Sequence, residues 1–140
     1  MAEPAWAIVV ARFYEHLADE LVAGATRVFE QAGGTVDVHA VPGAFELPLG
    51  ASYCAGSGRY RGVACLGAVI RGETSHYDHV CESAAEGILR VSLDTGVPCS
   101  FGVLTVESME QALARLGAKR HQGEDAARAV VAMAEMRERL

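Results

Sequence analysis

The sequence predicts an α/β protein with an open, mostly parallel four-stranded sheet and helices on both faces. Strand-length apolar runs alternate with segments of helical periodicity along the 140 residues. The runs are apolar at successive positions, as in strands that are buried on both faces of a parallel sheet. Because strand and helix alternate, each helix serves as a crossover between parallel strands. A chain of this length suits one core, so we expect residues 1–140 to form a single domain.

The amino-terminal part of the chain predicts two strands with a helix between them. Residues Ala7 to Ala11 form a short β-rich run, and apolar residues then recur at helical spacing to about Ala32. Gly33-Gly34 ends that helix. The second strand is expected from Val36 to Val41, where Pro42-Gly43 breaks it.

The middle part predicts a helix, the third strand and a longer helix. A helix-like stretch runs from Ala44 to about Ala55, and residues Gly56 to Gly62 are expected to form the return turn. The third strand is expected from Val63 to Ile70, and the longer helix from His76 to near Gly96. The expected buried face of that helix consists of Tyr77, Val80, Cys81, Ala84, Ala85 and Ile88.

The carboxyl-terminal part predicts the fourth strand and two more helices. The strand is expected from Cys99 to Val106, and Ser108 with Gln111 three residues later forms a capping-box pattern. The short helix that follows is expected to bury Met109, Ala112, Leu113 and Leu116. After a polar loop from Ala118 to Gly123, the last helix is expected to begin at Glu124. Together the elements predict a three-layer α/β/α sandwich of the flavodoxin-like type.

Composition narrows the class of protein. The apolar fraction is 51%, yet no apolar run is long enough to span a membrane. The formal net charge is −6 and no basic run occurs, which argues against nucleic acid and anionic membranes as partners. Met1 to Pro4 lack the features of a secretory signal, so the cytoplasm is the expected compartment. The cysteines stand singly and are expected to be reduced core residues: Cys54, Cys65, Cys81 and Cys99.

The carboxyl ends of the predicted strands carry the residues of greatest functional interest. In an open parallel sheet, ligands bind beyond these ends. The segments that follow the four strands are Arg12-Phe13, Pro42 to Glu46, Arg71 to His76, and Val106 to Ser108. We therefore expect a binding site at this edge of the sheet.

The segment from Arg71 to His76 has the features of an anion site with a base beside it. The first turn of a helix offers unpaired backbone N–H groups and the positive end of the helix dipole. Thr74 and Ser75 add hydroxyl donors, and the dipole favours a neutral His76 ring that can accept a proton near pH 7. The same residues also fit an ordinary helix start in which Thr74 or Ser75 is the N-cap. The spacing alone leaves both interpretations open.

Four more side chains are candidates, each with an ordinary structural alternative. Phe13 and Phe45 can stack on a planar heterocycle or simply fill the core. Glu46 can accept hydrogen bonds from ligand hydroxyls or be an acidic residue of a first helical turn. Arg115 can clamp a phosphate or lie in solvent. The histidines and cysteines show no metal-ligand spacing and no glycine-rich nucleotide loop occurs, so neither a metal nor a nucleotide is expected.

Three longer motifs resemble the lumazine synthase family. They are VPGAFE at Val41 to Glu46, GAVIRGETSHYDHV at Gly67 to Val80, and FGVLTVESMEQALAR at Phe101 to Arg115. They stand in the family's order and spacing, and the similarity extends from about Ala7 to the C-terminus. The resemblance implies condensation of 5-amino-6-(D-ribitylamino)uracil with 3,4-dihydroxy-2-butanone 4-phosphate to 6,7-dimethyl-8-ribityllumazine, phosphate and water, without a metal or organic cofactor. The alternative is a non-catalytic lumazine or flavin carrier, which would need no phosphate site.

The resemblance also implies a role for individual residues. The residues implied for the pyrimidine and its ribityl chain are Phe13 by stacking, Ala44, Phe45 and Glu46 at the ribityl chain, and Ala68, Val69 and Ile70 through backbone groups at the uracil edge. The residues implied for the phosphate are Glu73 and Thr74, with Arg115 as the counter-charge. His76 matches the family's proton-transfer residue, and Phe101 matches a second apolar wall.

Family resemblance further implies a homo-oligomer whose active sites lie between neighbouring subunits of a five-membered ring. Phe101, Arg115 and the loop after it would come from the adjacent chain. The short segment before Ala7, which contains Pro4, and the loop sequence GAKRHQG depart from members that build sixty-subunit shells, so a free pentamer or a pair of pentamers is expected. Gln122 stands where a lysine is common, which leaves Lys119 as the nearest cation, and Tyr14 replaces a frequent asparagine.

Overall fold

A computed structural model describes residues 5–140 and has a parallel sheet between two helical layers, which confirms the predicted fold class. The strands are β1 (Ala5–Ala11), β2 (Thr35–Val41), β3 (Tyr60–Ile70) and β4 (Cys99–Val106), in the order β2-β1-β3-β4. Every pairing is parallel. The expectation built on Met1 to Pro4 lies outside the described residues.

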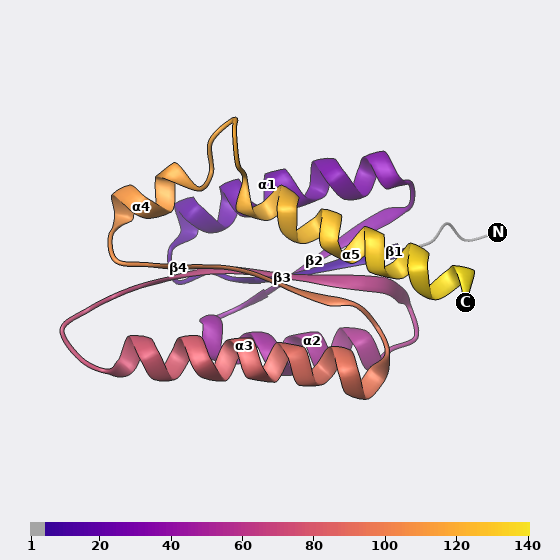
Figure 1. Ribbon diagram of the computed structural model, residues 1–140, viewed down its shortest axis with the longest axis horizontal. Helices are drawn as coiled ribbons and strands as arrows, with labels where there is room; N and C mark the ends of the chain where they lie inside the picture. The colour runs from indigo at the N-terminus through magenta and orange to yellow at the C-terminus, as the bar shows by residue number, and fades with distance from the viewer. Residues whose placement is uncertain (1–4) are drawn as a thin grey trace.

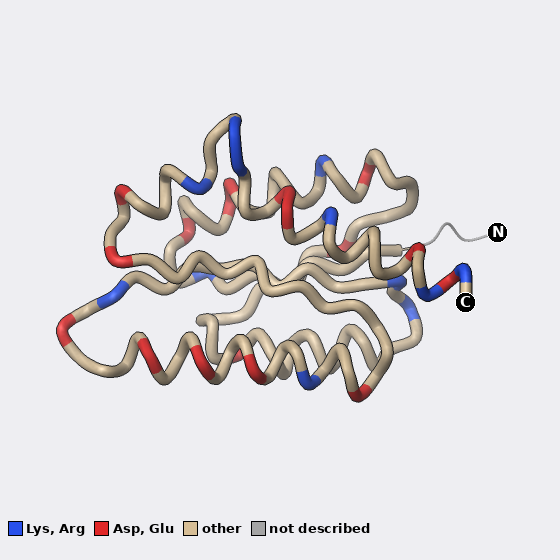
Figure 2. The backbone as a smooth tube through the Cα atoms, in the orientation of Figure 1, with Lys and Arg blue, Asp and Glu red and all other residues tan. Residues whose placement is uncertain are grey.

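The helices divide between the two faces of the sheet. They are α1 (Glu15–Ala32), the 3₁₀ turn η1 (Ala44–Glu46), α2 (Leu47–Gly56), α3 (His76–Thr95), α4 (Met109–Ala114) and α5 (Gln122–Arg139). Figure 1 shows α1, α4 and α5 on one face and α2 and α3 on the other. Lys, Arg, Asp and Glu lie mainly on the helices and loops, with few along the strands (Figure 2). No helix within residues 5–140 combines the length and hydropathy of a membrane span.

Each face of the sheet has its own apolar core. Under α1 and α5, Trp6 stacks on Phe29 with ring centroids 5.0 Å apart, and its indole N–H donates to the Gly33 carbonyl at 2.9 Å. The core under α2 and α3 is built from smaller residues and includes Val63, Leu47 and Ile88. The sheet is thus buried on both sides, as its continuously apolar strands predict.

The third strand begins earlier than expected. Residues Tyr60 to Gly62 belong to β3, so the predicted return turn from Gly56 to Gly62 is wrong at its end. Gly62 lies within β3 and not in a turn. Glycine is needed at this position because a larger side chain would collide with Val130 of α5. The glycine instead permits close approach of helix and strand.

The expected buried faces of two helices are partly wrong. In α4 only Ala112 is buried, while Met109 and Leu113 are 43% and 47% exposed. In α3, Ala84 and Ile88 are buried as expected, but Ala85 is exposed. Apolar periodicity identifies the face of a helix that is hydrophobic. It does not show whether that face is covered by the same chain or by another one.

Helices α4 and α5 start with side-chain caps. Ser108 Oγ accepts a hydrogen bond from the Gln111 N–H at 3.2 Å, as predicted, and Gln111 Oε1 accepts a hydrogen bond from the Glu107 N–H at 2.8 Å. Helix α5 begins at Gln122 instead of Glu124, because His121 caps it: Nδ1 of the buried ring accepts from the Glu124 N–H at 3.4 Å. The imidazole therefore has a structural role between α1 and α5.

Close packing of α1 on α5 yields a stability prediction. A methyl group on Gly123 would overlap the backbone carbonyl of Leu21. We expect Gly123→Ala to lower the free energy of unfolding by about 2–3 kcal/mol, because backbone atoms cannot rotate out of the way. The matched control is Gly56→Ala, whose added methyl meets nothing within 4 Å and should change stability by less than about 0.5 kcal/mol. Urea unfolding measures both, and equal midpoints for the two variants would contradict the argument.

Candidate functional site

A cavity of about 440 Å³ lies at the carboxyl edge of the sheet, where the sequence predicts binding. It is formed by the segments after β1 and β2, the end of β3, and the first turns of α3. Its lining consists of Phe13, Tyr14, Gly43, Ala44, Phe45, Glu46, Ala68, Val69, Ile70, Gly72, Thr74, His76, Tyr77 and Val80. Most of the residues that the sequence singles out therefore meet in one place.

Volume alone does not select this cavity. Others of about 430, 460 and 520 Å³ lie at the β4 edge, beside β2 and beside α4. The cavity at the carboxyl edge differs because it combines exposed aromatic rings, a carboxylate, an imidazole and the amino end of a 20-residue helix. Few polar groups converging on an apolar cleft are the usual make-up of a small-molecule site.

The two aromatic candidates are not core residues. Phe13 is 75% exposed and Phe45 is 63% exposed. The ring of Tyr14 contacts Phe13 edge-on, with centroids 4.9 Å apart and planes at 77°. Of the two interpretations left open by the sequence, core packing within the chain is thus wrong, and both rings are available to a planar ligand.

Glu46 is oriented by the turn that carries it. Its Oε1 accepts a hydrogen bond from the backbone N–H of Gly43 at 3.0 Å, which closes η1. Both interpretations of Glu46 therefore apply, because its carboxylate lies in the first turn of a helical segment and also lines the cavity. Fixed in this way at the cavity wall, it can accept hydrogen bonds from ligand hydroxyls with little loss of side-chain entropy.

The amino end of α3 opens onto the cavity with little capping of its own. Thr74 Oγ1 accepts from the His76 N–H at 3.3 Å, and the Ser75 carbonyl accepts from the His79 N–H at 3.2 Å. Residues 72–76 are exposed, and Glu73 does not line the cavity. An anion placed here would meet backbone N–H groups and the helix dipole with His76 beside it.

Positive charge within the chain does not reach the cavity. Its lining holds no lysine or arginine among the described residues. The arginines nearest in sequence are paired with acids, since Arg12 binds Asp19 at 2.6 Å and Arg71 binds Glu107 at 2.8 Å. Within the described residues, the cavity therefore offers an anionic ligand the backbone N–H groups and dipole of α3 and the imidazole of His76, without a lysine or arginine.

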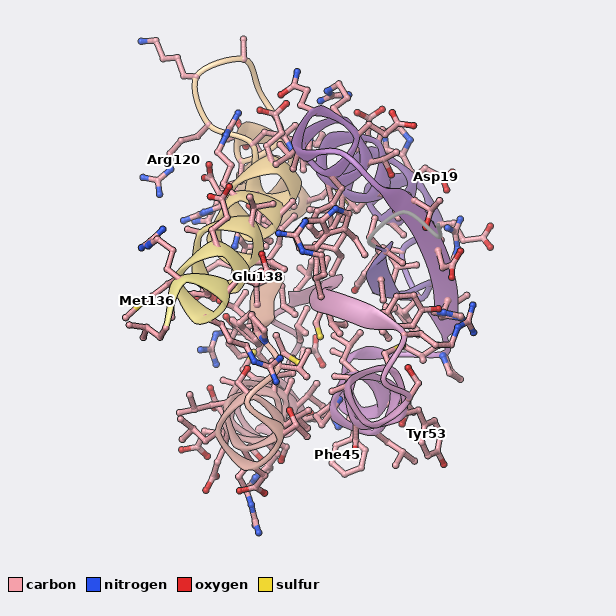
Figure 3. The ribbon with its side chains drawn as sticks, turned by 90° about the vertical axis from the view of Figure 1, so that its right-hand side faces the viewer. Asp19, Phe45, Tyr53, Arg120, Met136 and Glu138 are labelled. Carbon is pink, nitrogen blue, oxygen red and sulfur yellow. The ribbon has the colours of Figure 1, made fainter. Side chains whose placement is uncertain are left out.

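Three predicted site residues lie away from the cavity. Phe101 is on the edge strand β4 and is 36% exposed. Arg115 is the C-cap residue of α4, which lies on the face of the sheet opposite α3. It lines a separate cavity together with Arg120. Figure 3 shows Arg120 and Phe45 on opposite sides of the molecule. Lys119 is exposed in the loop before α5.

Some cavity residues were not among the predicted site residues. Tyr77 and Val80 were expected only to pack against the core, yet both line the cavity and are half-buried. Their position in the first turns of α3, directly after His76, is the signal that could have indicated this. Gly43, Gly72 and Tyr14 also contribute to the wall.

Other chemistries find little support in the described part of the chain. Within residues 5–140, no group of three or more His, Cys, Asp or Glu side chains could hold a metal ion. Burial raises the pKa of the Cys99 thiol to about 11 and that of Cys65 well above its ordinary value. Burial likewise raises the pKa of Cys54 and Cys81, so the free thiols are poor nucleophiles at neutral pH.

Comparison with known proteins identifies a family. A family profile described as 6,7-dimethyl-8-ribityllumazine synthase matches residues 4–138. The chain is 46% identical over 140 residues to a 6,7-dimethyl-8-ribityllumazine synthase of Salinibacter ruber, covering 96% of this chain and 89% of that protein. It is 51% identical over 130 residues to a protein of the same name from Thermococcus gammatolerans, covering 92% of this chain and 84% of that protein.

Proposed function

The chain belongs to the 6,7-dimethyl-8-ribityllumazine synthase family, and we propose that it condenses 5-amino-6-(D-ribitylamino)uracil with 3,4-dihydroxy-2-butanone 4-phosphate. The products are 6,7-dimethyl-8-ribityllumazine, phosphate and water. The observation that carries this proposal is the convergence of exposed aromatic rings, Glu46, His76 and a helix amino end on one cavity. We assign the reaction to residues 1–140 as one catalytic domain in the cytoplasm.

The aromatic end of the cavity suits the pyrimidine. We assign stacking on the heterocycle to Phe13, and polar contacts with the ribityl chain to the segment Ala44 to Glu46, where Glu46 presents an oriented carboxylate. The uracil edge is assigned to the backbone of Ala68 to Ile70, which lies at the end of β3 and lines the same wall. The heterocycle would thus lie across the carboxyl ends of β1 and β3.

The helical end of the cavity suits the phosphate ester. We assign the phosphate to backbone N–H groups at Glu73 and Thr74, in front of the amino end of α3. His76 is then placed beside the reacting carbons. The amine attacks the ketone to form an imine, phosphate leaves, and ring closure releases a second water, so each step needs a proton moved by a group such as His76.

A neighbouring subunit completes this arrangement. Phe101 and Arg115, with Lys119, are absent from the cavity of their own chain. We assign them to the cavity of an adjacent chain, where Phe101 would cover the heterocycle and Arg115 would neutralise the phosphate that no cation of the first chain reaches. A phosphate ester in a net acidic protein needs such a charge.

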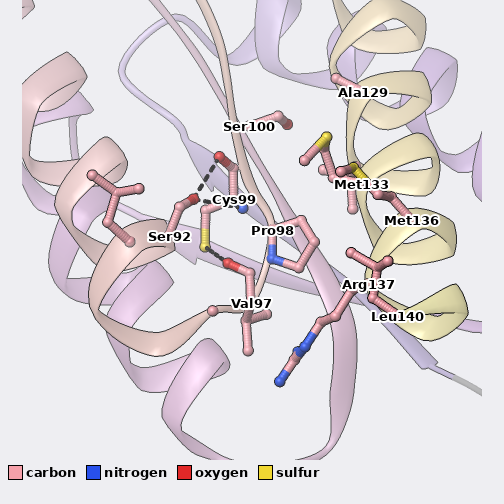
Figure 4. A pocket seen from close by; sticks show the side chains of 13 residues that line it. Ser92, Val97, Pro98, Cys99, Ser100, Ala129, Met133, Met136, Arg137 and Leu140 are labelled. Atoms are coloured by element: carbon pink, nitrogen blue, oxygen red, sulfur yellow. Dashed lines mark hydrogen bonds between the residues drawn. The ribbon is translucent and has the colours of Figure 1, made fainter.

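Exposed apolar surfaces support a ring assembly. Phe45, Leu49 and Tyr53 follow one another along the outer side of η1 and α2 and are 63%, 56% and 70% exposed. A different groove runs along β4 between α3 and α5, with Pro98, Met133 and Met136 in its wall (Figure 4).

Two unlike surfaces on one chain can pair head to tail, and such contacts form a closed ring when the rotation between neighbouring subunits closes. We propose a pentamer or a pair of pentamers, and a light-scattering mass near that of sixty chains would overturn this size.

The direct test follows product formation. Purified protein with both substrates should generate lumazine absorbance, and omission of the butanone phosphate should abolish the signal. A non-catalytic carrier would bind lumazine or flavin tightly and give no turnover, which would overturn the proposal. The apparatus for phosphate and protons around Thr74 and His76 favours the enzyme.

Removal of the imidazole should slow the chemical steps. We expect His76→Ala to lower kcat by about 10- to 100-fold, at or below the usual range for general acid–base catalysis, because water can reach this exposed position. KM for the pyrimidine should stay within about twofold, because the imidazole is assigned to proton transfer and not to binding of that substrate. An unchanged rate and pH profile would remove His76 from the mechanism.

Shared active sites predict complementation. Phe13→Ala and Arg115→Ala should each be nearly inactive alone. In rings formed at random from equal amounts of the two variants, a site is intact when one chain has Phe13 and its neighbour has Arg115, which holds for about a quarter of sites. Co-refolding of the two variants should therefore restore about 25% of wild-type activity. No recovery from well-formed mixed rings would place both residues in the same chain's site.

A further inference from the structure

Arg71 stands at a junction that the assigned site residues do not include. It follows β3 directly, and its backbone N–H donates to the Val106 carbonyl at 2.9 Å, which extends the pairing of β3 with β4 by one bond. Beyond it the chain leaves the sheet and forms residues 72–75, which are exposed. Arg71 is thus the last residue that the sheet holds before the assigned phosphate loop.

The side chain of Arg71 makes three separate contacts. Its Nε pairs with Glu107 Oε2 at 2.8 Å, just after β4, and its Nη2 pairs with Asp78 Oδ1 at 3.3 Å, in the first turn of α3. The guanidinium also lies over the ring of Tyr77, 4.2 Å from the centroid. Through these contacts one side chain joins the end of β4 to the start of α3 and to a wall of the cavity.

The loop between these points has few bonds of its own. Among the described residues, its hydrogen bonds are those from the His76 N–H to Thr74 Oγ1 and from the His79 N–H to the Ser75 carbonyl. Both are local and neither ties the loop to the sheet. The position of the loop relative to β3 and β4 therefore depends on what holds its two ends.

We propose that Arg71 is a positioning residue that holds the phosphate loop, residues 72–75, and the amino end of α3 in the geometry that binds phosphate. This inference rests on the proposed function of that loop. Arg71 does not line the cavity, and its charge is already shared by two carboxylates. It acts through the backbone of the loop and not as a ligand of the phosphate.

A single exposed ion pair contributes little to stability, so the hold of Arg71 on the loop must come from its two ion pairs and its ring contact together. The side chain of Arg71 is 39% exposed, and either carboxylate alone would hold it weakly. Two ion pairs and a ring contact start from one planar guanidinium and fix its orientation. A lysine at this position could reproduce that arrangement only in part, because its ammonium group is not planar.

The test measures inorganic phosphate binding to the full-length wild-type and variant proteins by calorimetry, alongside steady-state kinetics. Arg71→Met keeps an unbranched aliphatic side chain and removes the guanidinium that makes the two ion pairs. We expect the phosphate Kd and KM for the butanone phosphate to rise about tenfold, while KM for the pyrimidine stays within about twofold. Arg71→Lys should recover part of the loss. Equal changes for both substrates, or no change, would overturn a positioning role.

The same strand offers a matched control. Arg59 precedes β3 at its opposite end, pairs with Asp37 at 3.3 Å and lies over the Tyr60 ring at 5.3 Å. Arg59→Met removes the same kind of ion pair and ring contact from β3, far along the strand from the loop, and should leave phosphate binding unchanged. A similar loss in both variants would indicate general destabilisation and overturn the proposal.

Glu107→Ala separates positioning from direct binding. If Arg71 positions the loop, loss of its 2.8 Å partner should weaken phosphate binding by about threefold. If Arg71 is instead a ligand of the phosphate whose charge is occupied by Asp78 and Glu107, loss of Glu107 should tighten phosphate binding. That result would overturn the proposal. Calorimetry reads this without turnover, so a wild-type protein that binds phosphate but makes no lumazine would refute the proposed function alone.

Discussion

The pairing of β3 on both of its edges is the constraint on which the rest of the structure depends. β3 runs parallel to β1 on one side and to β4 on the other, so all strands end at the same edge of the sheet. Small residues make the fit possible, since a side chain at Gly102 would meet Leu66 and Ala126. Because the carboxyl ends are held together, segments distant in sequence meet around one cavity.

The fold could be predicted from the sequence because each strand and each helix shows the apolar pattern that is typical of its type. Continuous apolar runs and helical periodicity gave the right order and type of each element, and the strand ends gave the edge that holds the cavity. The start of β3 could not be found this way, since Gly62 looks like a turn residue until the approach of Val130 in α5 is known. His121 likewise stood in a polar loop, and only the packed structure shows it buried as a helix cap.

The exposure of individual apolar side chains was the property that the sequence predicted least well. Periodicity identifies apolar residues such as Leu113 and Met109, and the single chain leaves both exposed. Phe45, Leu49 and Tyr53 form a further exposed stripe. A pattern in sequence cannot say whether water is excluded by the same chain or by another, so the core and an interface look alike. Phe101 and Arg115 were named as site residues by the family resemblance, which assigns them to the cavity of an adjacent chain, and their own chain does not bring them to its cavity.

Charge gives the strongest argument that the cavity is only part of a site. The protein has a net charge of −6, and no lysine or arginine lines the cavity within the described residues. Asp78 and Glu107 stand close to the assigned phosphate loop, where unpaired carboxylates would repel an anion. Arg71 pairs with both, which leaves the helix dipole and backbone N–H groups as the remaining positive field. Such a field orients a phosphate but carries no full positive charge, which supports the proposal that an arginine of an adjacent chain completes the site.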